Sequence, residues 1–483
     1  MVAATTKRFL KDYPEALIGG AGAVFVGAGV SMGAGYPSWA SLLTEVGEEL
    51  GVKSGELHDL AALAQWSIQE NGSATQVRNV IKEQIGVEYP VPPTLEIISR
   101  LPVKYIWTTN YDRLVERAFG AVNRPIDTVS GAADLALRAT PGASRLFKMH
   151  GSIERLDDVV ISTDDYELYR SKRGAFLPLL QAHLSSMSML FLGISFTDPN
   201  IRHVLSLIRE SFISAPPEHF AIVRPPHRGD YRSEAEFETR SIQHRLWSRD
   251  LKRYGLVVVE IDDYAELPEL LRQVERRVAA RRVWVSGSWP PEAGAEIAKV
   301  YGVAQAIGQL VGNRGRDLVS GAGLVVGSAS IAGFLDALRS SGGWDLDRRL
   351  IARPFPQPIP GAAPDGVQWA ALRAELARIA GIVVFVGGMK VDPDTGSVMV
   401  AGGVLDEFEA AKAADCFVIP VGSTGGAAAQ ISDSLIGSAI DASGPNAMRP
   451  TDEELKELAR ADISVGKIVQ LVSAILTRID KRT

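Results

Sequence analysis

The 483-residue sequence predicts an α/β protein of two domains, each built around a parallel β-sheet with helices on both faces. Short apolar runs of strand length, such as AVFVGAG and IVVFVGG, alternate with longer segments of helical character along the whole chain. Nearly every run ends in glycine or a small polar residue, and ligands of parallel sheets bind outside these carboxyl ends. A chain of this length also exceeds what one hydrophobic core supports.

The composition excludes several classes of protein. A formal net charge of −6 gives no broad attraction for nucleic acid or an anionic membrane. The single cysteine, Cys416, excludes internal disulfides and a zinc site built from thiolates, so no metal is expected. The uncharged stretch between Glu15 and Glu45 is interrupted by glycine and proline, which argues against a membrane span. Asp12 and Glu15 interrupt any secretory signal, so we expect a cytoplasmic protein.

The domain boundary is expected near residue 281. Residues 262–282 have the pattern of a charged terminal helix, and the apolar run VWVSGS then begins a second glycine-rich α/β unit. We therefore expect a first domain over residues 1–281 and a second over residues 282–483.

The first glycine-rich turn lies in AVFVGAGVSMGAGYPSW, residues 23–39. Gly27, Ala28 and Gly29 allow backbone N–H groups to approach a pyrophosphate, and Ser31 can add a hydroxyl. A tight strand-to-helix turn without a ligand is an equal alternative on this motif alone. Met32 replaces the third glycine of the dinucleotide fingerprint, and the G-K-[ST] of a P-loop is absent, which argues against an ATPase.

Four segments in order resemble the sirtuin signature: residues 27–39, WTTNYD at 107–112, KMHGS at 148–152 and LFLGISFTDPN at 190–200. The resemblance implies a Rossmann-like domain that binds NAD and places a catalytic histidine at His150 beside Asn110. The NAD-binding residues that it implies are Gly27, Ala28, Gly29, Ser31, Tyr36, Pro37, Trp39, Asn110, Asp112, Gly193, Ser195, Asp198 and Asn200.

The chemistry of Asn110 and His150 suits cleavage of NAD. Breaking the bond between ribose and nicotinamide builds oxocarbenium character on the sugar, and nicotinamide is already a cationic leaving group. The site then needs a positioned ribose and water, together with a base that works near neutral pH. Asn110 can hydrogen-bond ribose hydroxyls or water, and His150 can take a proton.

The cysteine count bears on the reaction class. Sirtuin deacylases carry a zinc ribbon of four cysteines, which this chain lacks, so an acyl-lysine substrate is disfavoured and water is the simplest acceptor. Residues 159–169, VVISTDDYELY, also resemble sirtuin-like domains of bacterial defence proteins. We expect an NAD glycohydrolase that releases nicotinamide and ADP-ribose without a cofactor. The alternatives are a deacylase or ADP-ribosyltransferase with an unusual acceptor, and a nucleotide sensor without enzymatic activity.

The second domain resembles the SLOG family of nucleotide-binding domains. Its strand ends are SGSWPP, SGAGLVVGS, VGGMK and VGSTGG. Enzymatic SLOG members share a nearby glutamate that residues 420–430, PVGSTGGAAAQ, do not contain, so we expect a ligand sensor.

A sirtuin-like domain followed by a SLOG domain resembles the effectors of Thoeris anti-phage defence over almost the whole chain. The resemblance implies an NADase that depletes NAD during infection, assembles as a homotetramer, and is activated by a cyclic ADP-ribose isomer from a TIR-domain partner. It places the signal on Arg373, Lys390 and Glu407, with Asp406 or Glu409 as alternative acids and Arg353 as a rival phosphate ligand. The remaining expected effector-binding residues are Gly287, Ser288, Gly321, Gly323, Gly388, Gly422, Ser423, Thr424 and Gly425.

Overall fold

A computed structural model describes residues 2–57, 59–196, 198–211, 218–291, 294, 296–340, 342, 346–356, 365–392, 395–437 and 449–482. The chain divides into two compact units, Met1–Glu275 and Arg276–Thr483. The boundary expected after residue 281 lies just beyond this division, and helix α14 (Leu267–Ala280) runs across it.

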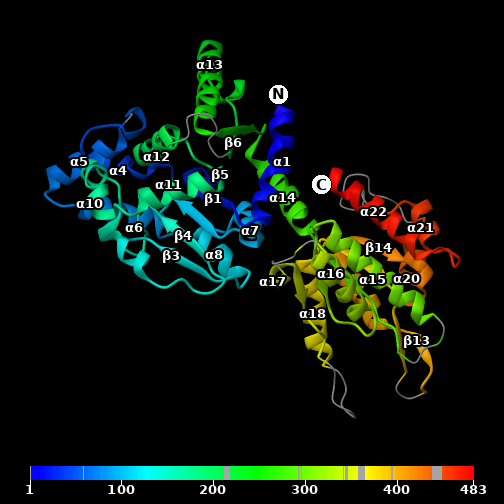
Figure 1. Ribbon diagram of the computed structural model, residues 1–483. Helices are drawn as coiled ribbons and strands as arrows, with labels where there is room; N and C mark the ends of the chain where they lie inside the picture. Colours follow the sequence, from blue (N-terminus) through cyan, green and yellow to red (C-terminus); the bar gives the residue numbers. More distant parts are fainter. Residues whose placement is uncertain are drawn as a thin grey trace. The chain divides into compact units, whose positions relative to one another are not determined.

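The first unit is built on a seven-stranded sheet in the order β3-β4-β2-β1-β5-β6-β7 (Figure 1). Every neighbouring pair is parallel, as the alternation of strands and helices predicts. The strands are β1 (Gly22–Val26), β2 (Tyr105–Thr108), β3 (Ile126–Val129), β4 (Ser144–Lys148), β5 (Ser188–Leu192), β6 (His219–Val223) and β7 (Leu256–Glu260).

Helices cover both faces of this sheet, which explains why strands such as β1 are buried along their whole length. On one face Phe25 and Phe191 stack with ring centroids 5.5 Å apart, under α11 and α12. On the other face the rings of Phe9, in α1, and Phe220 meet edge to face, with centroids 5.3 Å apart. The helices are α1 (Val2–Ile18), α2 (Ala28–Ala34), α3 (Trp39–Leu42), α4 (Thr44–Glu49), α5 (Leu60–Asn71), α6 (Thr75–Ile85), α7 (Pro93–Arg100), α8 (Leu114–Ala121), α9 (Thr163–Glu167), α10 (Tyr169–Arg173), α11 (Phe176–Ser186), α12 (Pro199–Ser211), α13 (Glu234–Leu251) and α14.

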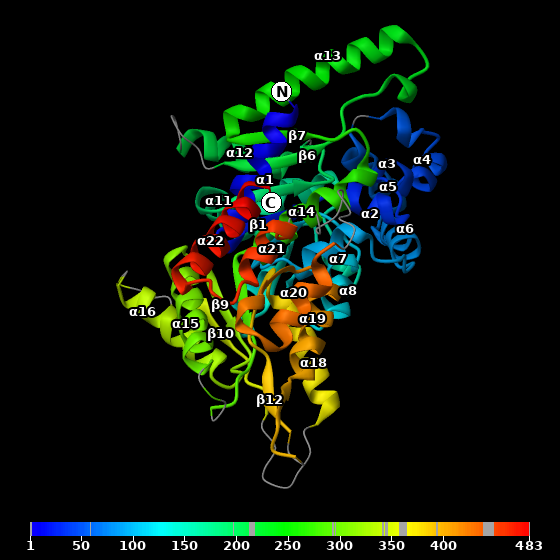
Figure 2. The same ribbon diagram turned by 90° about the vertical axis from the view of Figure 1, so that its right-hand side faces the viewer.

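The second unit has a five-stranded parallel sheet in the order β10-β9-β8-β11-β14. Its strands are β8 (Arg282–Ser286), β9 (Asp317–Ser320), β10 (Leu350–Ala352), β11 (Ile382–Val386) and β14 (Phe417–Val421). A separate antiparallel hairpin, β12 (Met389–Val391) and β13 (Val398–Val400), extends away from this sheet (Figure 2).

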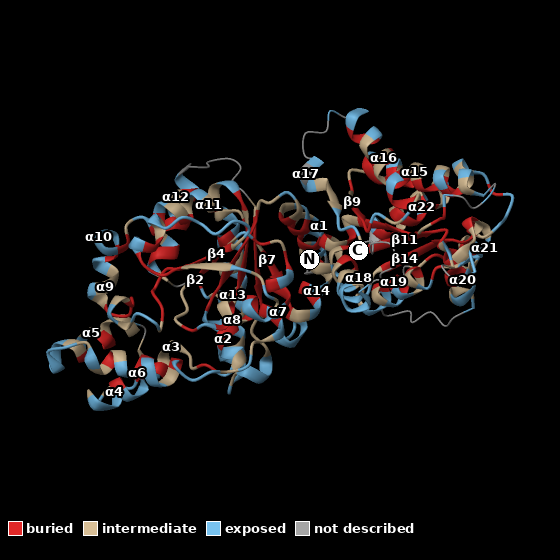
Figure 3. Cartoon of the chain, turned by 90° about the horizontal axis from the view of Figure 1, so that it is seen from below, coloured by how far each residue is buried: buried red, intermediate tan, exposed pale blue. Residues whose placement is uncertain are grey.

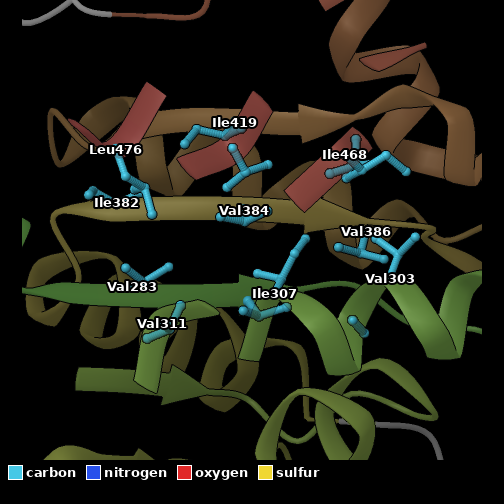
Figure 4. Close-up of a cluster of buried hydrophobic side chains, with 14 of the residues drawn as sticks. Val283, Val303, Ile307, Val311, Ile382, Val384, Val386, Ile419, Ile468 and Leu476 are labelled. Atoms are coloured by element: carbon cyan, nitrogen blue, oxygen red, sulfur yellow. The ribbon is translucent and has the colours of Figure 1, made fainter. Parts of the chain in front are cut away.

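The core of the second unit lies between its sheet and two long helices. Val283, Val384 and Ile419 project from β8, β11 and β14 toward Ile307 of α15 and Leu476 of α22 (Figure 4). The opposite face is covered by α18, α19 and α20, so the strands are buried and the helices are exposed on their outer sides (Figure 3). The helices are α15 (Ile297–Asn313), α16 (Val326–Ser340), α17 (Leu346–Arg349), α18 (Gly366–Ile379), α19 (Gly402–Ala413), α20 (Gly426–Leu435), α21 (Asp452–Leu458) and α22 (Val465–Arg482).

Within the described part of the chain, none of the helices combines the length and the apolar character needed to cross a bilayer.

Helices α15 and α16 pack closely because glycines lie where the two helices meet, so a larger residue there should destabilise the protein. A Cβ at Gly308 would overlap the carbonyl oxygen of Ser330, whereas a Cβ at Gly302 on the same helix meets only Val465 Cγ2 at 4.0 Å. Gly308→Ala should lower the free energy of unfolding by at least about 2 kcal/mol, because the two backbones must separate. Gly302→Ala should leave it unchanged or raise it by up to about 1 kcal/mol. Urea unfolding of both full-length variants checks this, and equal midpoints would contradict the close packing.

Candidate functional site

The carboxyl ends of four neighbouring strands bring together the residues expected to bind and cleave NAD. Gly27, Asn110 and His150 follow β1, β2 and β4, and residues 193–196 and 198–200 follow β5. The strand order reverses between β1 and β5, because the chain passes from β1 to β2 on one side and returns to β5 on the other. Parallel α/β sheets bind ligands at such a switch point.

Glycines allow the ends of β1 and β5 to touch. The N–H of Gly27 donates to the carbonyl of Leu192 at 2.8 Å, and the N–H of Gly29 donates to that of Gly193 at 2.9 Å. A Cβ on Gly27 would overlap the carbonyl oxygen of Gly193, which itself has a φ of +64°. The glycines thus serve a close backbone contact, and these two N–H groups are already used within the protein rather than left for a pyrophosphate.

The Asn110 side chain is held in one orientation by this turn. Its Nδ2 donates to the carbonyl oxygen of Gly27 at 3.0 Å and to Ser31 Oγ at 2.8 Å. Ser31 Oγ in turn donates to Asp112 Oδ2 at 2.7 Å. Because a carbonyl only accepts, the amide orientation is determined, and the buried Asn110 Oδ1 has no hydrogen-bond partner within the described part of the chain. Asn110 therefore offers a hydrogen-bond acceptor to a ligand.

Asp112 and a buried lysine hold the loop that carries Asn110. Asp112 Oδ1 accepts the N–H of Leu114 at 2.9 Å, at the start of α8. Lys148 Nζ donates to the carbonyls of Tyr111, at 3.3 Å, and of Asp112, and it pairs with Glu116 at 2.9 Å. Lys148 was not predicted from the sequence to have a role. A lysine at the end of an apolar strand, just before the MHG segment, could have indicated a buried ion pair.

His150 lies at the end of β4, buried against Asp198 and Tyr166. Its Nε2 lies 3.1 Å from Asp198 Oδ2, in a contact whose geometry falls outside that of a regular hydrogen bond. Burial raises the pKa of the Asp198 carboxyl, but His150, the N–H of Ile201 and the Tyr166 hydroxyl outweigh it and hold the pKa below its ordinary value. Burial raises the pKa of Tyr166, so this hydroxyl stays protonated.

Unpartnered polar atoms gather at these strand ends. Asn110 Oδ1, Asn200 Nδ2 and Trp39 Nε1 are buried, and none has a hydrogen-bond partner among the described residues. A buried polar atom without a partner costs free energy, and most such atoms in proteins are satisfied. His150 Nε2 is a fourth such atom at this site, and others occur elsewhere in the described chain. Asn110, Asn200 and Trp39 are residues expected from the sequence to bind NAD. Their arrangement suits a polar ligand.

The remaining expected NAD-binding residues differ in their surroundings. The buried Tyr36 donates its hydroxyl to the carbonyl of Val87 at 2.8 Å, so this group is satisfied by the protein. Ala28, the first residue of α2, and Ser195, in the loop after β5, are exposed, and Pro37 is partly exposed.

In the second unit, glycines again bring strand ends into contact. A Cβ on Gly287 would overlap the carbonyl of Val386, and a Cβ on Gly323 would overlap that of Gly287. Gly321 faces the Phe355 ring, which a Cβ would approach to 2.7 Å. The sheet order reverses between β8 and β11, so these contacts lie at the switch point of the second sheet.

Hydroxyl side chains complete the turns of this second switch point. Ser288 donates to the carbonyl of Met389 at 2.9 Å, and Thr424 Oγ1 accepts the N–H of Gly387 at 2.7 Å. Ser423 Oγ is buried and has no partner among the described residues. The other expected glycines of these turns are Gly388, Gly422 and Gly425.

Arg373 projects from α18 into a nearly closed environment. Its side chain is 12% exposed, and its Nη1 lies 3.3 Å from Asp406 Oδ2. The guanidinium carbon is 5.8 Å from the ring centroids of both Phe355 and Trp369. Arg373 Nε is buried, and none of the described residues is its hydrogen-bond partner. One carboxylate therefore satisfies only part of this cation, which leaves donors for an anionic ligand.

Glu407 reaches the end of β8. The buried carboxyl accepts a hydrogen bond from Ser286 Oγ at 2.5 Å. Burial raises the pKa of Glu407 to about 7, although Ser286 and Arg373 oppose the shift.

The other charged candidates are exposed. Lys390 lies on β12. Glu409 pairs with Lys412 at 2.7 Å, and Arg353 pairs with Glu375 at 3.1 Å. Among the described residues, no group of three or more His, Cys, Asp or Glu side chains is placed to hold a metal ion.

The two units match known domain families. The description "SIR2-like domain" matches residues 104–244, and "Sir2- and TIR-associating SLOG family" matches residues 266–479. The chain therefore contains a SIR2-like domain followed by a domain of this SLOG family, as the sequence predicted.

Curated relatives resemble the chain over most of its length. "NAD(+) hydrolase ThsA" of Bacillus cereus (strain MSX-D12) is 33% identical over 424 residues, covering 86% of this chain and 87% of that protein. The ThsA proteins of Enterococcus faecium and Acinetobacter baumannii (strain 532279) are each 29% identical, over 97% and 93% of this chain and 99% and 95% of their own lengths. The chain belongs to the ThsA family.

The burial of Glu407 should make the stability of the folded state depend on pH. Its folded-state pKa of about 7 exceeds its ordinary value of 4.5, so the protonated form is the one that folding favours. The folded state should lose stability as the pH rises from about 4.5 to about 7, by roughly 3 kcal/mol at most. Glu407→Gln cannot ionise and should escape this loss, so its stability relative to the wild type should rise with pH.

Glu409→Gln is the matched control, because Glu409 is exposed on the same helix. Urea unfolding of the three full-length proteins at several pH values between 4.5 and 8 checks the prediction. A stability difference between Glu407→Gln and the wild type that does not change with pH would contradict the burial of an ionisable group at this position.

Proposed function

We propose that this chain hydrolyses NAD⁺ to nicotinamide and ADP-ribose at the carboxyl ends of β1, β2, β4 and β5. The observation that carries the proposal is the placement of two complementary groups at neighbouring strand ends. Asn110 presents a buried, unpartnered acceptor, and His150 presents an imidazole held beside a carboxylate. Membership of the ThsA family, whose curated members are named NAD(+) hydrolases, supports the same activity.

Asn110 and His150 have different roles in the proposed hydrolysis. The bond from ribose C1′ to the nicotinamide nitrogen breaks, and its electron pair neutralises the pyridinium charge, so the leaving group needs no acid. Asn110 Oδ1 accepts a hydrogen bond from a ribose hydroxyl or from the attacking water. The water oxygen bonds to C1′, and His150 takes the proton that this water loses. The new hydroxyl on C1′ completes ADP-ribose.

Catalysis by Asn110 and His150 predicts the effect of removing either side chain. Asn110→Ala and His150→Ala should each lower NAD⁺ turnover at least about 100-fold while leaving the fold intact, because a positioned base contributes roughly 10²- to 10⁴-fold. Chromatography of the products, with circular dichroism of each variant, checks this. Asn79→Ala and His227→Ala are controls that should retain full turnover, since Asn79 is exposed on α6 and His227 lies in a surface loop.

Incubation with NAD⁺ alone separates hydrolysis from the competing activities. A deacylase or ADP-ribosyltransferase releases nicotinamide only when its protein acceptor is present, whereas water is always available. Near-normal turnover in a folded His150→Ala protein would show that His150 is not the general base.

We further propose that the second unit senses a cyclic ADP-ribose isomer made by a TIR-domain partner. The description of its family associates it with Sir2 and TIR proteins. The partly satisfied Arg373 suits a pyrophosphate, Lys390 adds an exposed cation, and Glu407 can accept from ribose hydroxyls. The signal must bind the active state more tightly, because equal affinity for two states shifts no population.

Substitution in the sensor should change the response to the signal without touching the chemistry. Arg373→Ala and Lys390→Ala should each raise the concentration of cyclic ADP-ribose isomer needed for half-maximal activation by about 10- to 150-fold, since each loses a charge-assisted bond to phosphate. Arg378→Ala, exposed on the same helix, is the control and should respond normally. Activation of both variants at wild-type ligand concentrations would mean that the signal binds elsewhere.

The biological role follows from these two activities. Depletion of NAD⁺ on receipt of the signal would stop an infected cell from supporting phage growth, which suits a defence effector. We propose that the protein acts as a cytoplasmic homotetramer without a metal or an organic cofactor.

A further inference from the structure

The surroundings of Asp198 differ from those of a residue that binds NAD directly, the role expected from the sequence. Its Oδ1 accepts the N–H groups of Asn200, at 2.9 Å, and Ile201, at 3.1 Å, at the start of α12. Its Oδ2 accepts the Tyr166 hydroxyl at 3.1 Å and lies 3.1 Å from His150 Nε2. The protein itself occupies both carboxylate oxygens, and the side chain is 14% exposed.

We propose that Asp198 is a positioning residue that acts through His150, holding the imidazole with its proton on Nε2 so that Nδ1 serves as the base. The inference rests on the proposed NAD⁺ hydrolysis. It adds Asp198 as a residue that positions the general base, His150. A carboxylate 3.1 Å from Nε2 favours a proton on that nitrogen, which leaves the lone pair on Nδ1. The tautomer thus follows from the position of the carboxylate rather than from the histidine alone.

Asp198 is itself held rigidly, as a positioning group must be. The first N–H groups of α12 fix one oxygen, and the helix dipole favours a negative charge at this end. The Tyr166 ring meets the His150 ring edge-on, with centroids 5.5 Å apart, while the Tyr166 hydroxyl holds the second oxygen. One tyrosine therefore contacts both members of the pair and restrains the imidazole plane.

The charges around the pair leave Asp198 as the anion closest to the imidazole. Tyr111, Tyr166 and Tyr169 surround it with hydroxyls whose pKa burial raises, so they remain neutral. The charged groups nearby are Asp165, which is bonded to Ser162, and Arg173, which pairs with Asp158 at 2.7 Å. When water attacks, its proton moves to Nδ1, and Asp198 stabilises the resulting imidazolium without taking the proton.

Asp198→Asn separates this role from a purely structural one. Asparagine caps a helix as well as aspartate does, so α12 should form normally, but the negative charge is lost. We expect kcat to fall roughly 10- to 1,000-fold with KM changed less than threefold. The pH–rate profile should change as well, because the negative charge beside the imidazole is gone.

Asp59→Asn is the matched control, because Asp59 caps α5 by accepting the N–H of Ala62 at 3.0 Å and is remote in sequence from the site. It should retain the wild-type kcat, KM and pH profile. Asp198→Glu, which keeps the charge at a different reach, should recover part of the kcat lost in Asp198→Asn.

Two kinetic results would overturn the inference while leaving NAD⁺ hydrolysis intact. A raised KM with unchanged kcat in Asp198→Asn would make Asp198 a ligand of the dinucleotide. An unchanged kcat and pH profile would make it only a helix cap. A wild-type protein that fails to hydrolyse NAD⁺ under every activating condition would instead refute the proposed function.

Nuclear magnetic resonance of the ¹⁵N-labelled histidine ring tests the tautomer independently of activity. The proton of neutral His150 should be on Nε2 in the wild type and should distribute over both nitrogens in Asp198→Asn. A proton on Nδ1 in the wild type would overturn the inference whatever the kinetics.

Discussion

The candidate active site depends on a backbone contact between the ends of β1 and β5. Gly27 donates its N–H to Leu192 and uses its carbonyl to hold the amide of Asn110. Any side chain at Gly27 would push the two strand ends apart, because the carbonyl of Gly193 occupies the space of a Cβ. Moving Gly27 would turn the Asn110 amide and misplace its free acceptor. A packing constraint therefore sets the orientation of a catalytic group.

The sequence predicts strand ends well and contacts between distant segments poorly. The alternation of apolar runs with glycine-rich turns is a local signal, and it correctly predicted two parallel sheets. Asn110 and His150 each follow a strand, so their meeting at one edge also follows from a parallel sheet. The pairing of His150 with Asp198, and that of Ser286 with Glu407, could not be predicted because each joins segments far apart in the chain. The internal use of the Gly27 N–H likewise depends on a partner strand that no local pattern identifies.

The two units use one architecture with different chemistry at the switch point. In each, glycines let strand ends approach at the reversal of the strand order. The first unit presents neutral amide and indole groups there, with a single imidazole beside a carboxylate. The second presents the guanidinium of Arg373 and the buried carboxyl of Glu407, which suit recognition of a ligand that carries phosphates and hydroxyls. The division fits catalysis in the first unit and sensing in the second.

We infer that three buried polar atoms at this site, which have no partner among the described residues, are contacts made by NAD⁺. A crystal structure of the full-length His150→Ala variant with NAD⁺ tests it most directly. In that structure, Asn110 Oδ1, Asn200 Nδ2 and Trp39 Nε1 should each acquire a hydrogen-bond partner from the dinucleotide or from a water bound to it, with the nicotinamide ribose beside Asn110. A dinucleotide bound elsewhere, with these three atoms still unpartnered, would contradict it.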